Sequence, residues 1–125
     1  MNVVDSSAWL EYFADGPNAA FFARAIETPD ALVVPSLTIY EVFKRVVQQR
    51  DEDSALRAIA VMQQGTVIDL DARLALSAAR VSLDTKLPMA DSVVLATARL
   101  HGATLWTQDA DFETLPGVRY RPRGA

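Results

Sequence analysis

The fold class is decided by residues 31–42, Ala31-Leu32-Val33-Val34-Pro35-Ser36-Leu37-Thr38-Ile39-Tyr40-Glu41-Val42. The first four residues are apolar throughout and have the length of a strand, a pattern typical of a strand buried on both faces in a parallel sheet. Pro35 and Ser36 then begin a segment whose apolar residues recur at helical spacing as far as Val47. A buried strand that leads directly into a helix favours an α/β fold.

The same alternation extends in both directions along the chain. We expect further strands at residues 3–4, 66–68, 104–106 and 118–120, and further helices over residues 6–13, 17–26, 51–62, 71–81 and 90–100. We find no repeat and no low-complexity linker in the sequence. The pattern therefore predicts a single domain over residues 1–125, with a mostly parallel central sheet of about four to five strands.

Several residues predict where helices begin and end. Ser6 or Ser7 is suited to cap the first helix, and Asp71 is suited to cap a later one. His101 and Gly102 are suited to close the helix at residues 90–100. Glycine readily adopts the left-handed conformation after a helix, and a histidine is favoured at the negative end of the helix dipole.

Composition is typical of a globular protein with a core. The chain has 125 residues, of which 50% are hydrophobic and 22% are charged, so it can bury a substantial apolar interior. Its apolar runs are far shorter than the roughly 20 residues of a membrane span, and Met1–Asp5 lacks the basic segment of a signal peptide. We expect a cytoplasmic protein that makes no membrane contact. The absence of cysteine excludes disulfides, thiolate nucleophiles and zinc–cysteine sites.

The net charge of −4 argues against a protein that wraps nucleic acid by bulk positive charge. It does not exclude an enzyme whose bound metal supplies positive charge locally. The basic residues include two short clusters, one within Lys44–Arg50 and one at the C-terminal end of the chain. Arg119, Arg121 and Arg123 of the second cluster form either a solvated tail or a contact to RNA phosphates.

Four acidic residues occupy positions that meet at one edge of such a sheet. Asp5 follows the first strand and Asp109 follows the strand at residues 104–106, so both lie at carboxyl ends of strands, where open parallel sheets bind ligands. Glu41 and Asp91 lie in the first turn or two of helices, and the starts of these helices point toward the same edge. We therefore expect the four carboxylates to converge on one pocket.

Such a pocket needs a positive partner. Two like charges about 4 Å apart repel by roughly 4 kcal/mol at an effective dielectric constant of about 20, and no Lys or Arg is adjacent to Asp5 or Asp91 in the sequence. A hard divalent cation with oxygen ligands, Mg²⁺ or else Mn²⁺, is the natural counter-charge. Water activated by such a cation can attack a phosphodiester, so the chemistry requires neither a Ser–His nor a Cys–His pair.

Four motifs resemble those of the PIN-domain family. Val3-Val4-Asp5-Ser6-Ser7-Ala8 resembles the family's first strand, which ends in an acid followed by small hydroxyl residues, and Ile39-Tyr40-Glu41-Val42 resembles its glutamate helix. Residues 87–98, which begin Leu87-Pro88-Met89-Ala90-Asp91, are similar to its central acidic helix, and Thr107-Gln108-Asp109-Ala110-Asp111-Phe112 is similar to its closing T-x-D-x-D-F element. The motifs follow the family's order, and the small size is most similar to VapC-type toxins of bacterial toxin–antitoxin pairs.

The resemblance implies a three-layer α/β/α fold and a metal-dependent endoribonuclease that cuts single-stranded RNA and leaves a 5′-phosphate. It implies a catalytic quartet of Asp5, Glu41, Asp91 and Asp109, in which the three aspartates hold Mg²⁺ or Mn²⁺ and Glu41 orients or activates water. The supporting residues implied in this way are Ser7, Thr107 and Asp111. The resemblance also implies a homodimer that is held inactive by a cognate VapB-like antitoxin.

Each acid also has a structural interpretation. Asp5 can end a strand and begin a turn, and Asp91 is favoured in a first helical turn by the helix dipole. Glu41 follows Thr38 by three residues, which is the spacing of a capping box. Asp109, with the acid two residues later, can form a loop and an N-cap. The coincidence of all four acids at sheet-end positions favours the metal site over these separate explanations.

Two other function classes compete with the nuclease. A phospho-accepting receiver domain needs neighbouring acids after its first strand and a Lys after a late strand, whereas here Asp5 stands alone and Trp106-Thr107-Gln108 offers no Lys, although Asp69 has the position of an acceptor. A catalytically silent binding module on the same fold is disfavoured by the intact acidic quartet.

Aromatic residues are concentrated in the first two expected helices. They are Trp9, Tyr12, Phe13, Phe21 and Phe22. Such a cluster is either part of the core or a surface for the antitoxin or a second copy of the chain.

Overall fold

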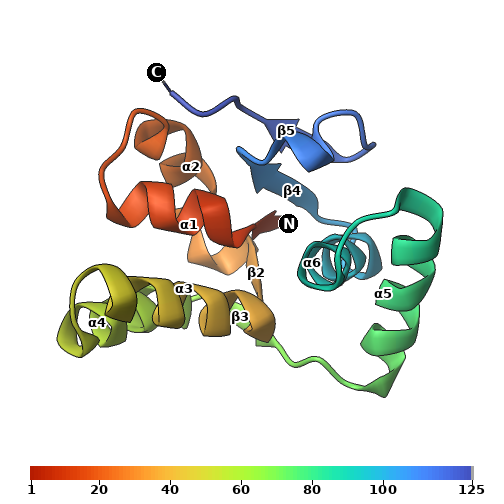
Figure 1. Cartoon of the computed structure of the whole chain (residues 1–125), viewed down its shortest axis with the longest axis horizontal. Helices are drawn as coiled ribbons and strands as arrows, with labels where there is room; N and C mark the ends of the chain where they lie inside the picture. The colour runs from red at the N-terminus through yellow and green to blue at the C-terminus, as the bar shows by residue number, and fades with distance from the viewer. Residues whose placement is uncertain (125) are drawn as a thin grey trace.

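The computed structural model describes residues 1–124 (Figure 1). The elements follow in the order β1 (Asn2–Val4), α1 (Ser6–Phe13), α2 (Ala19–Ile26), η1 (Pro29–Ala31), β2 (Leu32–Pro35), α3 (Ser36–Gln49), α4 (Glu52–Met62), β3 (Thr66–Ile68), α5 (Ala72–Thr85), α6 (Met89–Leu100), β4 (Thr104–Thr107), η2 (Ala110–Phe112) and β5 (Val118–Tyr120). The elements η1 and η2 are short 3₁₀ helices. Across residues 1–124, none of the helices is long and apolar enough to cross a membrane.

The strands form one sheet in the order β3-β2-β1-β4-β5, and every pairing among the described residues is parallel. Val3 of β1 lies opposite Val33 of β2 on one side and Leu105 of β4 on the other. The chain moves outward from β1 through β2 to β3 and then returns to the far side of β1 for β4. The reversal between β1 and β4 is a topological switch point, where open α/β sheets bind their ligands.

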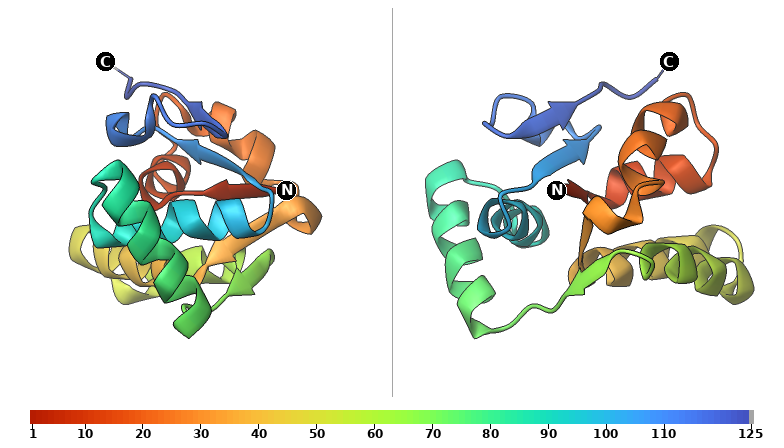
Figure 2. Two further views of the ribbon diagram at one scale, coloured as in Figure 1. Left: turned by 90° about the vertical axis from the view of Figure 1, so that its right-hand side faces the viewer. Right: turned by 180° about the vertical axis from the view of Figure 1, so that it is seen from behind.

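Helices cover both faces of the sheet, which confirms the expected three-layer α/β/α fold. Successive side chains of a strand point to opposite faces. Val4 and Trp106 belong to the core that includes α1, α2, α3 and α4, whereas Val3 and Leu105 belong to the core that includes α5 and α6. Figure 1 shows α1 and α2 on one side of the sheet and α5 and α6 on the other, and the left view of Figure 2 shows α5 and α6 in front of the strands.

The aromatic cluster of α1 and α2 belongs to the first of these cores. Trp9 and Phe22 are fully buried, and Tyr12, Phe13 and Phe21 are partly buried against them. The Trp9 and Phe13 rings stack with their centroids 5.7 Å apart. Most of this aromatic surface therefore stabilises the fold. The three partly buried rings lie at the edge of this core, where α1 and α2 meet solvent.

The cap of α1 differs from the sequence prediction. Neither Ser6 nor Ser7 occupies the N-cap position; Asp5 does, and its Oδ1 accepts a hydrogen bond from the backbone N–H of Ala8 at 3.1 Å. The helix begins at Ser6, one residue earlier than a Ser6 cap allows and two earlier than a Ser7 cap allows, because an aspartate caps as well as a serine and here follows the strand directly. The predicted cap of α5 is confirmed, since Asp71 accepts from the N–H of Leu74.

The start of α2 differs from the sequence prediction, whereas the end of α6 agrees with it. Helix α2 begins at Ala19, two residues later than predicted, because a turn closed by the bond from the Ala19 N–H to the Gly16 carbonyl precedes it. The predicted end of α6 is confirmed. His101 Nδ1 lies 2.9 Å from the Thr97 carbonyl oxygen, and Gly102 has a φ of 58°, the left-handed conformation that glycine adopts without strain.

Candidate active site

The carboxylates that the sequence placed at the sheet edge lie at the switch point between β1 and β4. Asp5 follows β1 directly, and Asp109 follows β4 after one intervening residue. Both carboxylates also cap the next helix: Asp5 accepts from the Ala8 N–H, and Asp109 Oδ1 accepts from the Asp111 N–H at 2.9 Å. The strand-to-helix connections therefore fix both side chains at this edge.

Asp5 is held by hydroxyl groups on both of its oxygens. Its Oδ1 accepts a bond of 2.7 Å from Ser7 Oγ, and its Oδ2 accepts a bond of 2.7 Å from Thr107 Oγ1. Thr107 Oγ1 in turn accepts a bond of 2.9 Å from the backbone N–H of Asp109. Asp5 is only 4% exposed, and Thr107 is completely buried. One threonine hydroxyl thus connects the acid after β1 to the loop after β4.

Glu41 lies in the second turn of α3 and receives a hydrogen bond from Ser6, which the sequence indicates only as a candidate helix cap. Ser6 Oγ donates to Glu41 Oε1 at 3.0 Å. A second hydroxyl directly after Asp5 was the available signal in the sequence. The alternative in which Thr38 and Glu41 form a capping box is wrong, because α3 already begins at Ser36 and the Thr38 hydroxyl donates to the Pro35 carbonyl at 2.7 Å.

Asp91, the third residue of α6, faces the acids of the β4 loop. One carboxylate oxygen each from Asp91, Asp109 and Asp111 lies within 4.8 Å of the other two, a spacing suited to a shared cation. Asp111 therefore belongs to the tightest group of acids, although the family resemblance implies only a supporting role for it. Asp5 lies outside this group; its Oδ1 accepts from Ser7 and Ala8, whereas its Oδ2 accepts only from Thr107 and keeps a second acceptor position.

The electrostatics of the site show negative charge without compensation. Burial, followed by the nearby carboxylates of Asp109, Asp5, Glu41 and Asp111 in that order, raises the pKa of Asp91 to about 7. These influences connect all five acids, including the two outside the tightest group. The site therefore favours a proton or a cation at Asp91 near neutral pH.

Burial is also the largest influence on the pKa values of Asp5 and Glu41. It raises the pKa of Asp5 to about 6, against the lowering effect of the hydrogen bonds from Thr107, Ser7 and Ala8, and the charge of Asp109 adds to the rise. Burial raises the pKa of Glu41, and the hydrogen bond from Ser6 opposes that shift. Groups with raised pKa values gathered in one place are typical of functional sites.

The donor set fits a hard divalent cation. Every ligand atom offered by the acidic group is a carboxylate oxygen, which is the donor that Mg²⁺ and Mn²⁺ prefer. The raised pKa of Asp91 is the second observation in favour of the fit, because a bound cation would supply the positive charge that the surrounding acids lack.

A buried amide pair, also missed in the sequence, anchors the loop after β4. Gln108 Nε2 donates to the Ser7 carbonyl at 3.4 Å, and Gln108 Oε1 accepts from Asn18 Nδ2 at 3.1 Å. Asn18 Nδ2 also donates to the Pro122 carbonyl at 2.9 Å. Because Asn18 and Gln108 are far apart in the sequence, local patterns could not indicate that they meet.

Two of the three C-terminal arginines rest on aromatic rings. The Arg119 guanidinium carbon lies 4.9 Å from the Trp106 ring centroid, and that of Arg121 lies 4.4 Å from the Phe21 centroid. Arg123 is exposed. Arg119 and Arg121 therefore belong to the packing of β5 against α2 and β4, rather than to a fully solvated tail.

Comparisons with known proteins agree with this fold. A sequence profile described as PIN domain matches residues 3–118. No curated protein matches the sequence. A chain of a toxin–antitoxin complex from Klebsiella pneumoniae has a TM-score of 0.81 and 22% identity, with 95% of this chain and 96% of that chain covered.

Two further solved structures illustrate the range of the likeness. The sarcin-ricin loop cleaving toxin VapC20 from Mycobacterium tuberculosis has a TM-score of 0.80 and 19% identity, with 98% of this chain and 100% of that chain covered. A protein from Pyrobaculum aerophilum has a TM-score of 0.74 and 25% identity, with coverages of 95% and 87%. At these identities the structural likeness concerns the fold.

Proposed function

This chain belongs to the PIN-domain family, and from that premise we propose that it is the toxin of a toxin–antitoxin pair and acts as a metal-dependent endoribonuclease on single-stranded RNA in the cytoplasm. The observation that carries the proposal is the set of carboxylates at the switch point, with the pKa of Asp91 raised to about 7 by burial and by its acidic neighbours. A fold alone does not assign a function, whereas the chemistry of this site does favour one.

The proposal assigns the metal to Asp5, Asp91 and Asp109. Mg²⁺ is the expected ion, and Mn²⁺, with similar ligand preferences, is the expected substitute. A divalent ion held by these carboxylates would lower the pKa of water and neutralise phosphate charge. Asp111 belongs to the tight acidic group and supports the same ion. Ser7 and Thr107 hold Asp5 in position through the two hydroxyl bonds.

The remaining catalytic role falls to Glu41. Its carboxylate, held on one oxygen by Ser6, accepts the proton of the attacking water. The water oxygen forms a bond to phosphorus, the bond from phosphorus to the 3′-oxygen breaks, and a proton passes to that leaving oxygen. The products are a 5′-phosphate and a 3′-hydroxyl. The raised pKa of Glu41 favours this role, because a carboxylate with a higher pKa is a stronger base.

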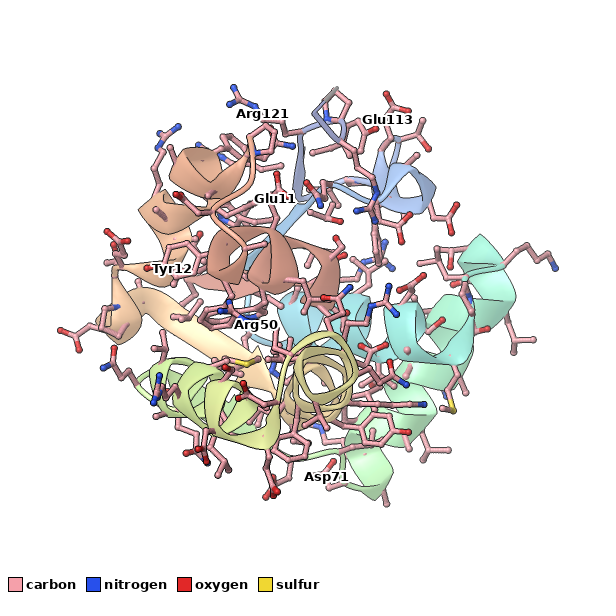
Figure 3. The ribbon with its side chains drawn as sticks, turned by 60° about the vertical axis from the view of Figure 1, so that its left-hand side comes forward. Glu11, Tyr12, Arg50, Asp71, Glu113 and Arg121 are labelled. Carbon is pink, nitrogen blue, oxygen red and sulfur yellow. The ribbon has the colours of Figure 1, made fainter. Side chains whose placement is uncertain are left out.

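The partner proposed for the chain is a VapB-like antitoxin. Its support is the likeness, over nearly the whole chain, to a chain of the Klebsiella pneumoniae toxin–antitoxin complex. A groove of about 290 Å³ between α1, α3 and α4 provides a surface for such a peptide, with an apolar wall that includes Leu10 and Phe13 and with Arg50 and Arg57 among its lining residues. Figure 3 shows Arg50 below α1 and beside α3 and α4. An antitoxin segment with apolar and acidic side chains would complement this groove.

A homodimer is also proposed, and an exposed apolar face on α5 supports it. Leu76 and Leu83 are 70% and 73% exposed, and their separation of seven residues places them on the same side of the helix. Large exposed leucines on one face are typical of an interface. Leu83→Asp should shift the sedimentation coefficient from that of a dimer to that of a monomer, whereas Leu56→Asp on α4 should not.

The alternative of a receiver domain has less support. The residue that follows Thr107 of β4 is Gln108, whose amide is engaged with Ser7 and Asn18, and not the lysine that phosphoryl chemistry in such domains needs. The alternative of a silent binding module shares the fold and the acids, so only an activity measurement separates it from the nuclease.

The test is cleavage of a mixed pool of single-stranded RNA by the purified chain. We expect cleavage with Mg²⁺ or Mn²⁺, none with EDTA, and 5′-phosphate ends on the products. Asp91→Asn should abolish cleavage, whereas Asp84→Asn on the exposed side of α5 should cleave like the wild type. Equal activity of the two variants, or cleavage that persists in EDTA, would contradict the proposal. A wild type that binds metal but leaves RNA intact would favour the silent module.

A further inference from the structure

A second groove borders the acidic site along α3. It has a volume of about 240 Å³ and is lined by Tyr40, Glu41, Lys44, Arg45 and Gln48. Glu41 belongs both to this groove and to the acidic site, where it receives the Ser6 hydrogen bond. Whatever lies in the groove is therefore directly beside the proposed point of cleavage.

The groove combines an exposed aromatic ring with a cation. Tyr40 is 59% exposed, an unusual position for a large ring in the middle of a helix. Lys44 lies four residues later on the same face, with its Nζ 5.7 Å from the centroid of the Tyr40 ring. Arg45 extends the positive charge along the helix.

An exposed ring and cations beside the acidic site are significant because the chain as a whole is negatively charged and repels nucleic acid. The net charge is −4, and the adjoining site gathers five carboxylates. The acids repel a polyanion that approaches this site unless cations lie nearby, and Lys44 and Arg45 line the groove that also includes Glu41. Arg119 and Arg121, near the end of the sheet, rest on the Trp106 and Phe21 rings and do not line this groove.

We infer that Tyr40, Lys44 and Arg45 form a subsite for one nucleotide of single-stranded RNA next to the cleaved bond. A base stacks on the Tyr40 ring, and the two cations contact the neighbouring phosphates. Stacking on an aromatic side chain needs an unpaired base and tolerates any base type, because every base has a π-face. The subsite thus selects single strands without reading sequence. This inference rests on the proposed function, since it names how the same site holds its substrate.

The occupant is RNA rather than another protein because the groove offers charge for phosphates and one flat ring, and its lining contains no aliphatic residue. The groove between α1, α3 and α4 is different, since its lining includes Leu10, Ala58 and Val61. Protein partners prefer apolar cores at their interfaces.

The test measures binding separately from cleavage. A fluorescein-labelled RNA of twelve nucleotides with phosphorothioate linkages, which resist hydrolysis, is titrated with each protein in Mg²⁺ and followed by anisotropy. We expect Tyr40→Ala to weaken binding about tenfold and Tyr40→Phe to bind like the wild type, because phenylalanine keeps the ring. Lys44→Ala should weaken binding severalfold and reduce the slope of log K against log salt by about 0.7. Arg99→Ala, at the far end of α6, is the matched control and should change neither quantity.

A small substrate shows whether the acidic site itself is intact. Hydrolysis of bis(p-nitrophenyl) phosphate, which has no neighbouring nucleotide, should proceed in Tyr40→Ala at the wild-type rate. Equal binding of RNA by Tyr40→Ala and the wild type would overturn the subsite. So would an equal loss on both substrates, which would place the effect at Glu41, or a change in self-association without a change in RNA binding. If the wild type binds RNA through Tyr40 but hydrolyses nothing, the subsite stands and the proposed activity fails.

Discussion

Asp5 and Asp51 are both N-caps of helices, but Asp5 is buried and Asp51 is exposed. Each follows a strand or loop, caps the next helix, and accepts a backbone N–H three residues later, at 3.1 Å from Ala8 and 2.7 Å from Ser54. Burial raises the pKa of Asp5 to about 6. The hydrogen bonds from Ser54 lower the pKa of Asp51, with a smaller contribution from the neighbouring charges of Arg50 and Arg57.

The opposite pKa shifts of these two caps show that helix capping alone does not indicate a functional carboxylate. Helix capping stabilises a fully charged carboxylate, and Asp51 behaves accordingly. At Asp5 the same cap is outweighed by burial and by the acid of the β4 loop. What distinguishes the candidate site is negative charge that no nearby basic side chain offsets at Asp91.

The largest effect concerns activity. Asp5→Asn keeps a side chain that can cap α1 but removes the charge, and we expect at least about a 100-fold loss of kcat/KM for RNA, or about 2.7 kcal/mol of transition-state stabilisation. Asp51→Asn makes the same change at the exposed cap and should retain wild-type kcat/KM. The measurement is steady-state cleavage of a labelled RNA in Mg²⁺. Equal losses in the two variants would remove the distinction between the two caps.

The next effect concerns metal and stability. A cation that binds the folded chain alone stabilises it by about 2.7 kcal/mol at a concentration 100 times its Kd. We expect Mg²⁺ to raise the Tm at pH 8 and to raise it less at pH 5, because protonated carboxylates bind metal poorly. Asp91→Asn should remove most of the increase, and Asp51→Asn should leave it unchanged. A Tm that rises equally in both variants would indicate binding away from the site.

The third effect is the pH dependence of stability without metal. The folded-state pKa values of Asp5 and Asp91, about 6 and about 7, lie above the ordinary value of 3.8. A carboxyl group whose pKa is raised by folding contributes stability that is fully present below its unfolded pKa and is lost as the pH rises through its folded pKa. We therefore expect the free energy of unfolding to fall by about 2 kcal/mol between pH 5 and pH 8, after a reduction for the half-exposed Asp91.

The exposed cap should show the opposite sign. The lowered pKa of Asp51 contributes stability that is present above its ordinary value and is lost as the pH falls below it, so Asp51 has no effect between pH 5 and pH 8. Urea titrations in EDTA at several pH values provide the measurement. In Asp5→Asn/Asp91→Asn the curve should be nearly flat over this range, and a slope equal to that of the wild type would show that other groups cause it.

The smallest effect is on the two caps themselves. Asp5→Asn without metal should raise the Tm slightly at pH 8, because it removes repulsion while an asparagine still caps the helix. Asp51→Ala should lower the Tm by a few degrees, because the N–H of Ser54 loses its acceptor. Calorimetry in EDTA would show the two shifts, and a loss of stability in both variants would mean that Asp5 serves the fold more than the site.

The sequence was sufficient where local patterns carry the information. The apolar run of β2 predicted a strand buried on both faces, and the acids after β1 and β4 were predicted to share one edge because parallel strands end together. The start of α2 was misplaced by two residues, since the turn before it depends on backbone bonds that composition does not indicate.

Contacts across the chain could not be predicted in this way. The bond from Ser6 to Glu41 spans 35 positions, and that from Thr107 to Asp5 spans 102. The packing of Arg119 on Trp106 follows from the register of β5 against β4, which a sequence alone does not fix. Such pairings depend on tertiary geometry, so the residue types were visible but their partners were not.

The most direct test of the account is an NMR titration of the Asp91 side-chain carboxyl carbon, with and without Mg²⁺. Without metal the account predicts a pKa of about 7, and with saturating Mg²⁺ it predicts a carboxylate that stays ionised well below that value. An Asp91 pKa near the ordinary 3.8 that Mg²⁺ does not move would contradict the account, because the site would then hold no uncompensated charge for a cation to neutralise.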